Sequence, residues 1–182
     1  GLVKGSKFNN LRRVGPVLPA IKVYNSREVD ELIFLDIVAS TKNLDIDYQT
    51  ISEFSKFCFV PLTVGGGIDN IEKAKKLLEI GADKISINTP ALENPTLITD
   101  LAETFGSQCV VVGIDSFFNG TDHVVYAKTG SETSKYMTGM RTVDWLREAQ
   151  DRGAGEVVLN CMNQDGVRKG YDIEQLLSLI HI

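Results

Sequence analysis

The chain has 182 residues, of which 43% are hydrophobic and 24% charged, and this is the make-up and length of one soluble globular domain. Its net charge of −5 argues against a general nucleic-acid or anionic-membrane binder, because those proteins need a basic surface to meet phosphates. Any phosphate that binds must be held by a local site.

Short apolar runs rich in β-branched residues alternate along the chain with longer stretches of helical period, which is typical of βα units around a parallel sheet. The runs predict strands at 31–37, 59–64, 84–88, 108–115 and 156–160. The stretches between them predict helices at 16–25, 48–57, 70–80, 95–105, 142–152 and 172–180. We therefore expect a single α/β domain over residues 1–182.

The stretch 116–140 breaks this alternation, since it is far longer than an ordinary βα loop. It carries three glycines and the alternating run Val124-Val125-Tyr126. Long ordered loops in compact domains are usually functional. We predict a β-hairpin insertion there, above the rim of the sheet.

Polar residues mark both ends of the predicted strands. The strand starts carry Glu31, Lys84, Gln108 and Glu156, and the strand ends carry Asp36, Asn88, Asp115 and Asn160. A closed parallel barrel places all strand starts on one face and all strand ends on the other. The pattern therefore predicts two separate polar layers, with chemistry at the strand-end layer.

A glycine triplet, Gly65 to Gly67, lies between the strand 59–64 and the helix 70–80. Glycines there let backbone N–H groups approach an anion, and the helix N-terminus adds favourable dipole potential. Alone, such a triplet more often is a flexible turn. The donors Ser86, Asn88 and Thr89 at the next strand end favour a phosphate site.

Three carboxylates at strand ends are candidates for chemistry. Asp115 directly follows a strongly apolar strand, where it suits a general acid or base, although a capping role fits its position equally well. Asp165 stands in an Asp-Gly pair, for which a turn role is the default. Asp36 is better placed to orient a substrate than to transfer protons.

The cysteines give no sign of a metal or cofactor site. Cys58, Cys109 and Cys161 are odd in number and lack CxxC spacing, so we expect neither a disulfide framework nor a zinc site. A reducing cytoplasmic location fits best. No apolar run approaches the ~20 residues of a membrane span.

Five segments in chain order resemble the cyclase subunit of imidazole glycerol phosphate synthase, a (β/α)8 TIM barrel of histidine biosynthesis. They are residues 34–37, 61–68, 84–89, 105–115 and 152–172. The resemblance implies a lyase without a cofactor. In that reaction ammonia attacks a bis-phosphorylated ribulosylformimino-aminoimidazole carboxamide nucleotide, which yields imidazole glycerol phosphate and an aminoimidazole carboxamide ribotide.

The resemblance also assigns roles to residues. Asp115 matches one of the two acid–base aspartates of the family. The residues implied in substrate binding are Lys4, Asp36, Gly66, Gly67, Asn88, Thr89 and Asp165. Glu31, Lys84 and Glu156 match three of four residues of a charged gate, through which ammonia arrives from a glutaminase partner docked at the strand-start face.

By the same resemblance the chain holds about strands 2 to 6 of the barrel and is truncated at both ends. Open sheet edges would then favour self-association, and we expect the isolated chain to be inactive. Two alternatives stay open. One is a paralogous ammonia-dependent protein of sugar amidation in surface-polysaccharide synthesis, and the other is a non-catalytic barrel arc that binds a glutaminase.

Overall fold

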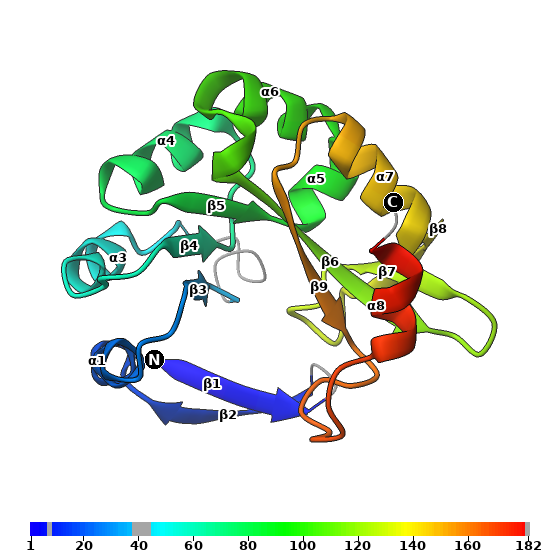
Figure 1. Ribbon diagram of the computed structural model, residues 1–182, viewed down its shortest axis with the longest axis horizontal. Helices are drawn as coiled ribbons and strands as arrows, with labels where there is room; N and C mark the ends of the chain where they lie inside the picture. The colour runs from blue at the N-terminus through cyan, green and yellow to red at the C-terminus, as the bar shows by residue number, and fades with distance from the viewer. Residues whose placement is uncertain (7–8, 38–44, 181–182) are drawn as a thin grey trace.

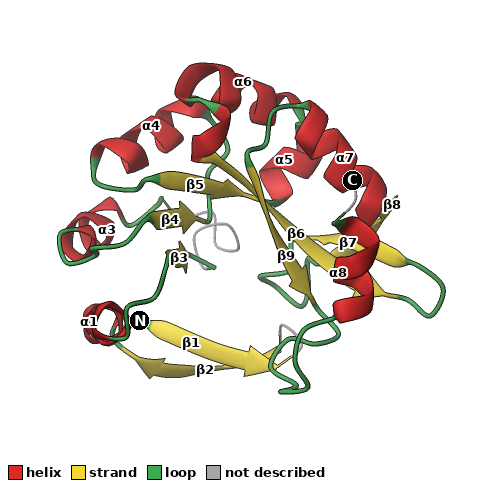
Figure 2. Ribbon diagram, in the orientation of Figure 1, coloured by secondary structure: helices red, strands yellow, loops and turns green. Residues whose placement is uncertain are grey.

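A curled seven-stranded sheet forms the centre of the molecule, and most helices lie along its convex side (Figures 1 and 2). The computed structural model describes residues 1–6, 9–37 and 45–180. The parallel part of the sheet has the order β3-β4-β5-β6-β9. This arc of parallel strands with helices between them confirms the predicted α/β class and the incomplete barrel.

The five parallel strands lie within about three residues of their predicted bounds. They are β3 (Leu32–Leu35), β4 (Leu62–Gly65), β5 (Lys84–Ile87), β6 (Val110–Phe118) and β9 (Glu156–Cys161). β4, β5 and most of β6 are buried, and in β6 this burial explains the uninterrupted apolar run from Val110 to Ile114.

The six predicted helices are also present. They are α1 (Val17–Ser26), α3 (Tyr48–Ser55), α4 (Ile71–Glu79), α6 (Thr96–Phe105), α7 (Thr142–Asp151) and α8 (Ile173–Leu179). Three of them begin at a side-chain cap, because Asp47, Asn70 and Asp172 each accept a hydrogen bond from a backbone N–H three residues later. None of the helices in the described ranges is long and apolar enough to cross a membrane.

The stretch 116–140 contains two antiparallel strands, β7 (His123–Ala127) and β8 (Tyr136–Arg141). β6 runs on to Phe118, and its last four residues pair with β7. β5 pairs with residues 110–112 of β6, and β9 pairs with residues 111–116. β7 therefore takes over from β5 on one edge of β6, and the two strands extend the sheet beyond the parallel arc.

Four elements lie outside the predicted set. β1 (Leu2–Ser6) and β2 (Asn9–Gly15) form an antiparallel ribbon, α5 (Thr89–Glu93) is a single short helix, and η1 (Ser107–Cys109) is a 3₁₀ turn. The ribbon crosses below the open side of the arc, so that one of its ends approaches the segment after β9 (Figure 1).

The core lies between the parallel strands and the helices that cover them. Its largest fully buried side chains include Trp145 of α7, Ile85 of β5 and Leu101 of α6. On β3, which is the edge strand of the parallel arc, Ile33 and Leu35 remain 47% and 44% exposed. The packing is therefore densest around β5 and β6, which position the site described next.

Candidate functional site

The carboxyl ends of the parallel strands meet at one face of the arc. Asp115 of β6 lies opposite Asn160 of β9 in the strand register, and Asn88 directly follows β5. Strand ends of a parallel barrel converge in this way, which is why active sites of such barrels form there. Three members of the predicted strand-end polar layer, Asn88, Asp115 and Asn160, are thus in contact.

Asp115 is only 2% exposed, and three side chains donate hydrogen bonds to its carboxylate. Its Oδ2 accepts from Asn88 Nδ2 at 2.9 Å and from Thr129 Oγ1 at 2.5 Å. Its Oδ1 accepts from Asn160 Nδ2 at 2.8 Å. Three donors that converge on one carboxylate from separate elements fix its orientation.

The cap interpretation of Asp115 does not describe this arrangement. A helix or loop cap accepts from backbone N–H groups, whereas Asp115 accepts from three side chains, which come from β9, from the β5–α5 junction and from the segment after β7. Asp115 is therefore a buried carboxylate held by side chains of separate elements.

Two of these donors were not among the predicted site residues. Asn160 was noted only as a polar strand end, although the strand-end pattern that selected Asp115 applies to it equally. Thr129 lies 14 residues beyond Asp115, and no sequence signal marks it. It reaches the carboxylate because β7 returns antiparallel along β6.

Asn88 has a second polar atom in the site. Its Nδ2 donates to Asp115, while its buried Oδ1 has no hydrogen-bond partner among the described residues. The neighbouring Thr89 accepts a hydrogen bond from the backbone N–H of Lys128 at 2.9 Å. Asn88 therefore connects the end of β5 with β6, and Thr89 connects it with the segment that follows β7.

The glycine loop packs directly on the end of β3. Gly66 has φ +103°, and a Cβ at this position would collide with the carbonyl oxygen of Asp36 and lie 2.9 Å from its backbone nitrogen. The N–H of Asp36 in turn donates to the Gly65 carbonyl at 2.8 Å. Only glycine fits this close approach, so the loop and Asp36 form one unit.

The helix after this loop adds a cation. Lys73 of α4 donates to the Gly67 carbonyl at 3.3 Å and forms an ion pair with Asp69 at 2.8 Å. Gly67 itself has φ +71°. The glycine loop thus has a fixed backbone conformation with a positive charge nearby, as an anion site requires.

A cavity of about 470 Å³ lies at the other side of the site. Its lining includes Lys4 of β1, Asn160 and Cys161 of β9, and Asp165 in the loop after β9. Asn160 borders this cavity and also donates to Asp115. The structure therefore brings Lys4 and Asp165 together, and Asn160 connects them with the buried carboxylate.

The strand-start face carries a charged cluster of Glu31, Lys84 and Glu156. Lys84 Nζ lies 3.1 Å from Glu31 Oε1 and 2.6 Å from Glu156 Oε1. The hydrogen bond from Lys84 to Glu156, and to a lesser degree the one to Glu31, raises the pKa of this lysine above its usual value. Gln108, the fourth polar strand start, is exposed and turns toward the Phe105 carbonyl instead.

The thiols and other soft ligands do not cluster. Cys58, Cys109 and Cys161 are free thiols, and burial raises the pKa of the Cys161 thiol. Among the described residues no group of three or more His, Cys, Asp or Glu side chains is arranged to hold a metal ion.

Comparison with known proteins assigns the family. A family model described as "Histidine biosynthesis protein" matches residues 1–181. The chain belongs to this family. It is 49% identical over 180 residues to the imidazole glycerol phosphate synthase subunit HisF of Pseudoalteromonas atlantica, which covers 98% of the chain and 70% of the relative. The subunits of the same name from Idiomarina loihiensis and Vibrio cholerae are also 49% identical, and the chain covers 68% and 69% of their lengths.

The family assignment decides between the readings that the sequence left open. The relatives carry the name of a histidine-biosynthesis synthase subunit, so this chain is a member of an enzyme family and the cyclase interpretation is confirmed.

Proposed function

We propose that Asp115 is an acid–base residue of the cyclase reaction, in which ammonia converts the bis-phosphorylated nucleotide into imidazole glycerol phosphate and an aminoimidazole carboxamide ribotide. The observation that carries this proposal is the position of Asp115, buried at the carboxyl end of β6 under three side-chain donors. A carboxylate held in one orientation can accept a proton from an attacking amine and return it to a leaving group.

The donors act on the reaction through Asp115. Asn88, Thr129 and Asn160 are positioning residues, because each holds one carboxylate oxygen at hydrogen-bond distance. Catalytic groups lose efficiency when they rotate out of the attack geometry.

Substrate binding is divided between two sides of Asp115. On one side, Gly66 and Gly67 offer backbone N–H groups to a phosphate, and Asp36 and Thr89 complete the surroundings. On the other side, Lys4 and Asp165 border the 470 Å³ cavity. A bis-phosphorylated substrate that spans both sides would place its central atoms over the buried carboxylate.

The charged cluster at the strand starts suits the passage of ammonia from a glutaminase partner. Lys84 closes the face by binding two carboxylates at once, while its own side chain is only 15% exposed. A partner that draws Glu31 or Glu156 away would open this contact without unfolding a strand. We assign the glutaminase to this face, and the reaction to the cytoplasm.

The unpaired side of β3 is the expected place of self-association. Ile33 and Leu35 keep large exposed apolar surfaces there. Exposed sheet edges of this kind pair readily with another copy. A concentration-dependent sedimentation coefficient of the 182-residue chain would support this expectation.

The reaction assignment is tested with the Asp115→Asn variant of the intact protein. With ammonium salt as nitrogen donor, kcat should fall by about 10²- to 10⁴-fold, the usual contribution of a general acid or base. Asp100→Asn, on the exposed face of α6, is the matched control and should keep the parent rate. Turnover of Asp115→Asn at the parent rate would contradict the assignment.

A further inference from the structure

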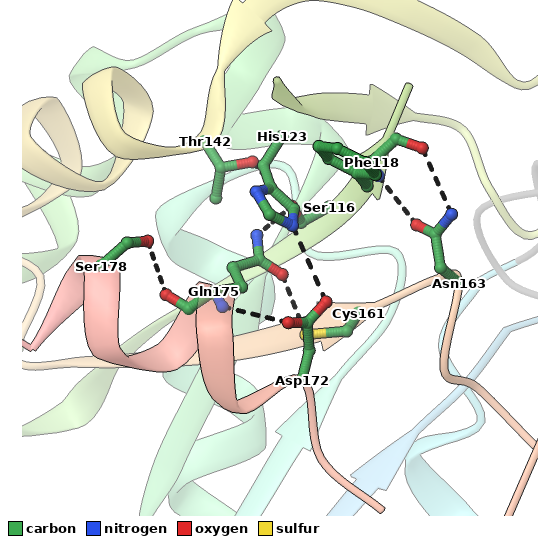
Figure 3. A network of polar contacts seen from close by, with 9 residues as sticks. All are labelled: Ser116, Phe118, His123, Thr142, Cys161, Asn163, Asp172, Gln175 and Ser178. Carbon is green, nitrogen blue, oxygen red and sulfur yellow. Dashed lines mark hydrogen bonds and ion pairs between the residues drawn. The ribbon is translucent and has the colours of Figure 1, made fainter. Parts of the chain in front are cut away.

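A second cluster of buried polar side chains lies next to the site, between β6, α7 and α8 (Figure 3). Ser116, Thr142 and Gln175 are each only 1% exposed. The hydroxyls of Ser116 and Thr142 lie 2.7 Å apart, and Gln175 Nε2 donates to the Ser116 hydroxyl. Buried polar groups are costly unless they are hydrogen-bonded, so this cluster is a fixed arrangement.

Gln175 uses both ends of its amide, and each end reaches a different element. Its Nε2 binds Ser116 of β6, and its Oε1 accepts from the Cys161 thiol of β9 at 3.0 Å. The backbone N–H of Gln175 donates to Asp172 Oδ1 at 3.0 Å. One side chain therefore connects the first turn of α8 with the two strands that carry Asp115 and Asn160.

The loop between β9 and α8 is anchored on the same part of β6 at its other end. The Met162 N–H donates to the Ser116 carbonyl at 2.8 Å. Asn163 forms two hydrogen bonds with the backbone of Phe118, accepting from its N–H at 2.8 Å and donating to its carbonyl at 3.2 Å. Ser116 therefore binds both ends of the loop, through its carbonyl at the end of β9 and through its hydroxyl at the start of α8.

A further contact, between His123 and Asp172, lies at the end of the loop where α8 begins. His123 Nε2 of β7 lies 3.7 Å from Asp172 Oδ2, and Figure 3 shows both side chains above the first turn of α8. Asp172 and Cys161 both line the 470 Å³ cavity, as does Asp165 within the loop. The anchored ends are therefore parts of the cavity wall.

We infer that Gln175 and Ser116 are positioning residues of the reaction: their hydrogen bond sets where the loop 163–171, with Asp165, lies relative to Asp115. Ser116 is the residue next to Asp115 on β6, and its backbone and side chain each hold one end of the loop. A movement of the loop would change the distance between Asp165, which lines the cavity, and the carboxylate of Asp115. This inference rests on the proposed substrate role of Asp165.

The test compares two ways of removing the hydrogen bond in the intact protein. Gln175→Leu alone leaves the Ser116 hydroxyl with fewer partners. The double variant Ser116→Ala with Gln175→Leu removes both partners of this hydrogen bond, and it costs some stability because the buried Thr142 hydroxyl loses its contact with Ser116. Ser55→Ala is the matched control, because it deletes a hydroxyl bond to the Ile80 carbonyl in another part of the molecule.

Two measurements are made on each variant: amide hydrogen exchange of residues 163–171, and steady-state turnover with ammonium salt. We expect faster exchange in this loop and a KM for the nucleotide raised about tenfold or more, with a smaller change in kcat, because misplaced binding groups weaken substrate capture. Thr142→Ser keeps the hydroxyl that contacts Ser116, so this variant should retain the parent KM.

Parent-like exchange and parent-like KM in the folded double variant would overturn the inference. Faster loop exchange without a change in KM would also overturn it, since the cluster would then be structural only. A failure of the proposed function can be told apart from a failure of this inference. In that case Asp115→Asn would turn over at the parent rate, while hydrogen exchange would still report how the loop is held.

Discussion

The Asn160→Ala variant perturbs the surroundings of the buried carboxylate while Asp115 itself is unchanged. The variant removes the 2.8 Å hydrogen bond to Asp115 Oδ1 and leaves two donors on Oδ2. A hydrogen bond to a charged group contributes about 1.5 to 3 kcal/mol to stability. For a protein of this size that corresponds to a fall of about 3 to 12 °C in the thermal midpoint, at about 2 to 4 °C per kcal/mol.

The effect on turnover should exceed the effect on stability. With Oδ1 released, Asp115 can rotate away from the orientation that its three donors fix, and misplacement of a reacting group by about 1 Å can cost about 10²-fold in rate. Asn160→Asp should be worse than Asn160→Ala, because it sets two carboxylates against each other at hydrogen-bond distance.

Thermal unfolding followed by circular dichroism and kcat with ammonium salt are the two assays. Asn119→Ala is the control, because Asn119 accepts backbone hydrogen bonds from Thr121 and Asp122 at the exposed turn between β6 and β7. An Asn160→Ala protein with the parent midpoint and the parent kcat would refute the reasoning.

Three other changes test separate parts of the structure. Gly66→Ala should lower the thermal midpoint and raise the KM for the nucleotide, because a left-handed φ alone costs about 1 to 3 kcal/mol and the new Cβ collides with Asp36; unchanged values would contradict the packing. Lys84→Met should spare turnover with ammonium salt but reduce turnover supported by glutamine and the glutaminase, and equal losses would argue against a gate. Asp47→Ala should lower the free energy of unfolding by about 1 kcal/mol, measured by urea titration, because it removes the cap of α3.

The Asp47 and Lys84 contacts also predict opposite pH dependences. Hydrogen bonds from the Thr50 hydroxyl and then its N–H lower the pKa of Asp47 below 3.8, so its contribution is complete above that pH and is lost as pH falls through the lower folded-state pKa. The pKa of Lys84 is raised above 10.5, so the stabilisation from its ion pairs is complete below 10.5 and is lost only as pH rises through the higher folded-state pKa. The lysine contact therefore stays charged throughout the neutral range.

Strands and helices were predictable where burial alone decides the residue types. The run Val110 to Ile114 is buried on both faces of its strand, and β-branched residues are the natural outcome. The helix predicted at 70–80 begins one residue later in the structure, at Ile71. The β1–β2 ribbon escaped prediction because the stretch 9–15 shows no alternation of apolar and polar residues.

The site was predictable in some of its members but not in its connections. Asp115 and Asn88 could be named from their strand-end positions, because that pattern depends only on chain direction. The contact from Thr129 depends on the return path of β7, and the one from Asn160 depends on the register between β6 and β9. Pairings between distant strands leave no local mark in the sequence.

The register of β6 limits how this family can vary in length. Successive residues of a strand face opposite sides, so a single insertion between Val110 and Asp115 would turn the carboxylate toward the helices and carry Ile114 into its place. Beyond Phe118 the chain reverses in an exposed turn, where added residues disturb no pairing with β9. Insertions and deletions among homologues should therefore gather after Phe118, while the distance from Val110 to Asp115 stays constant.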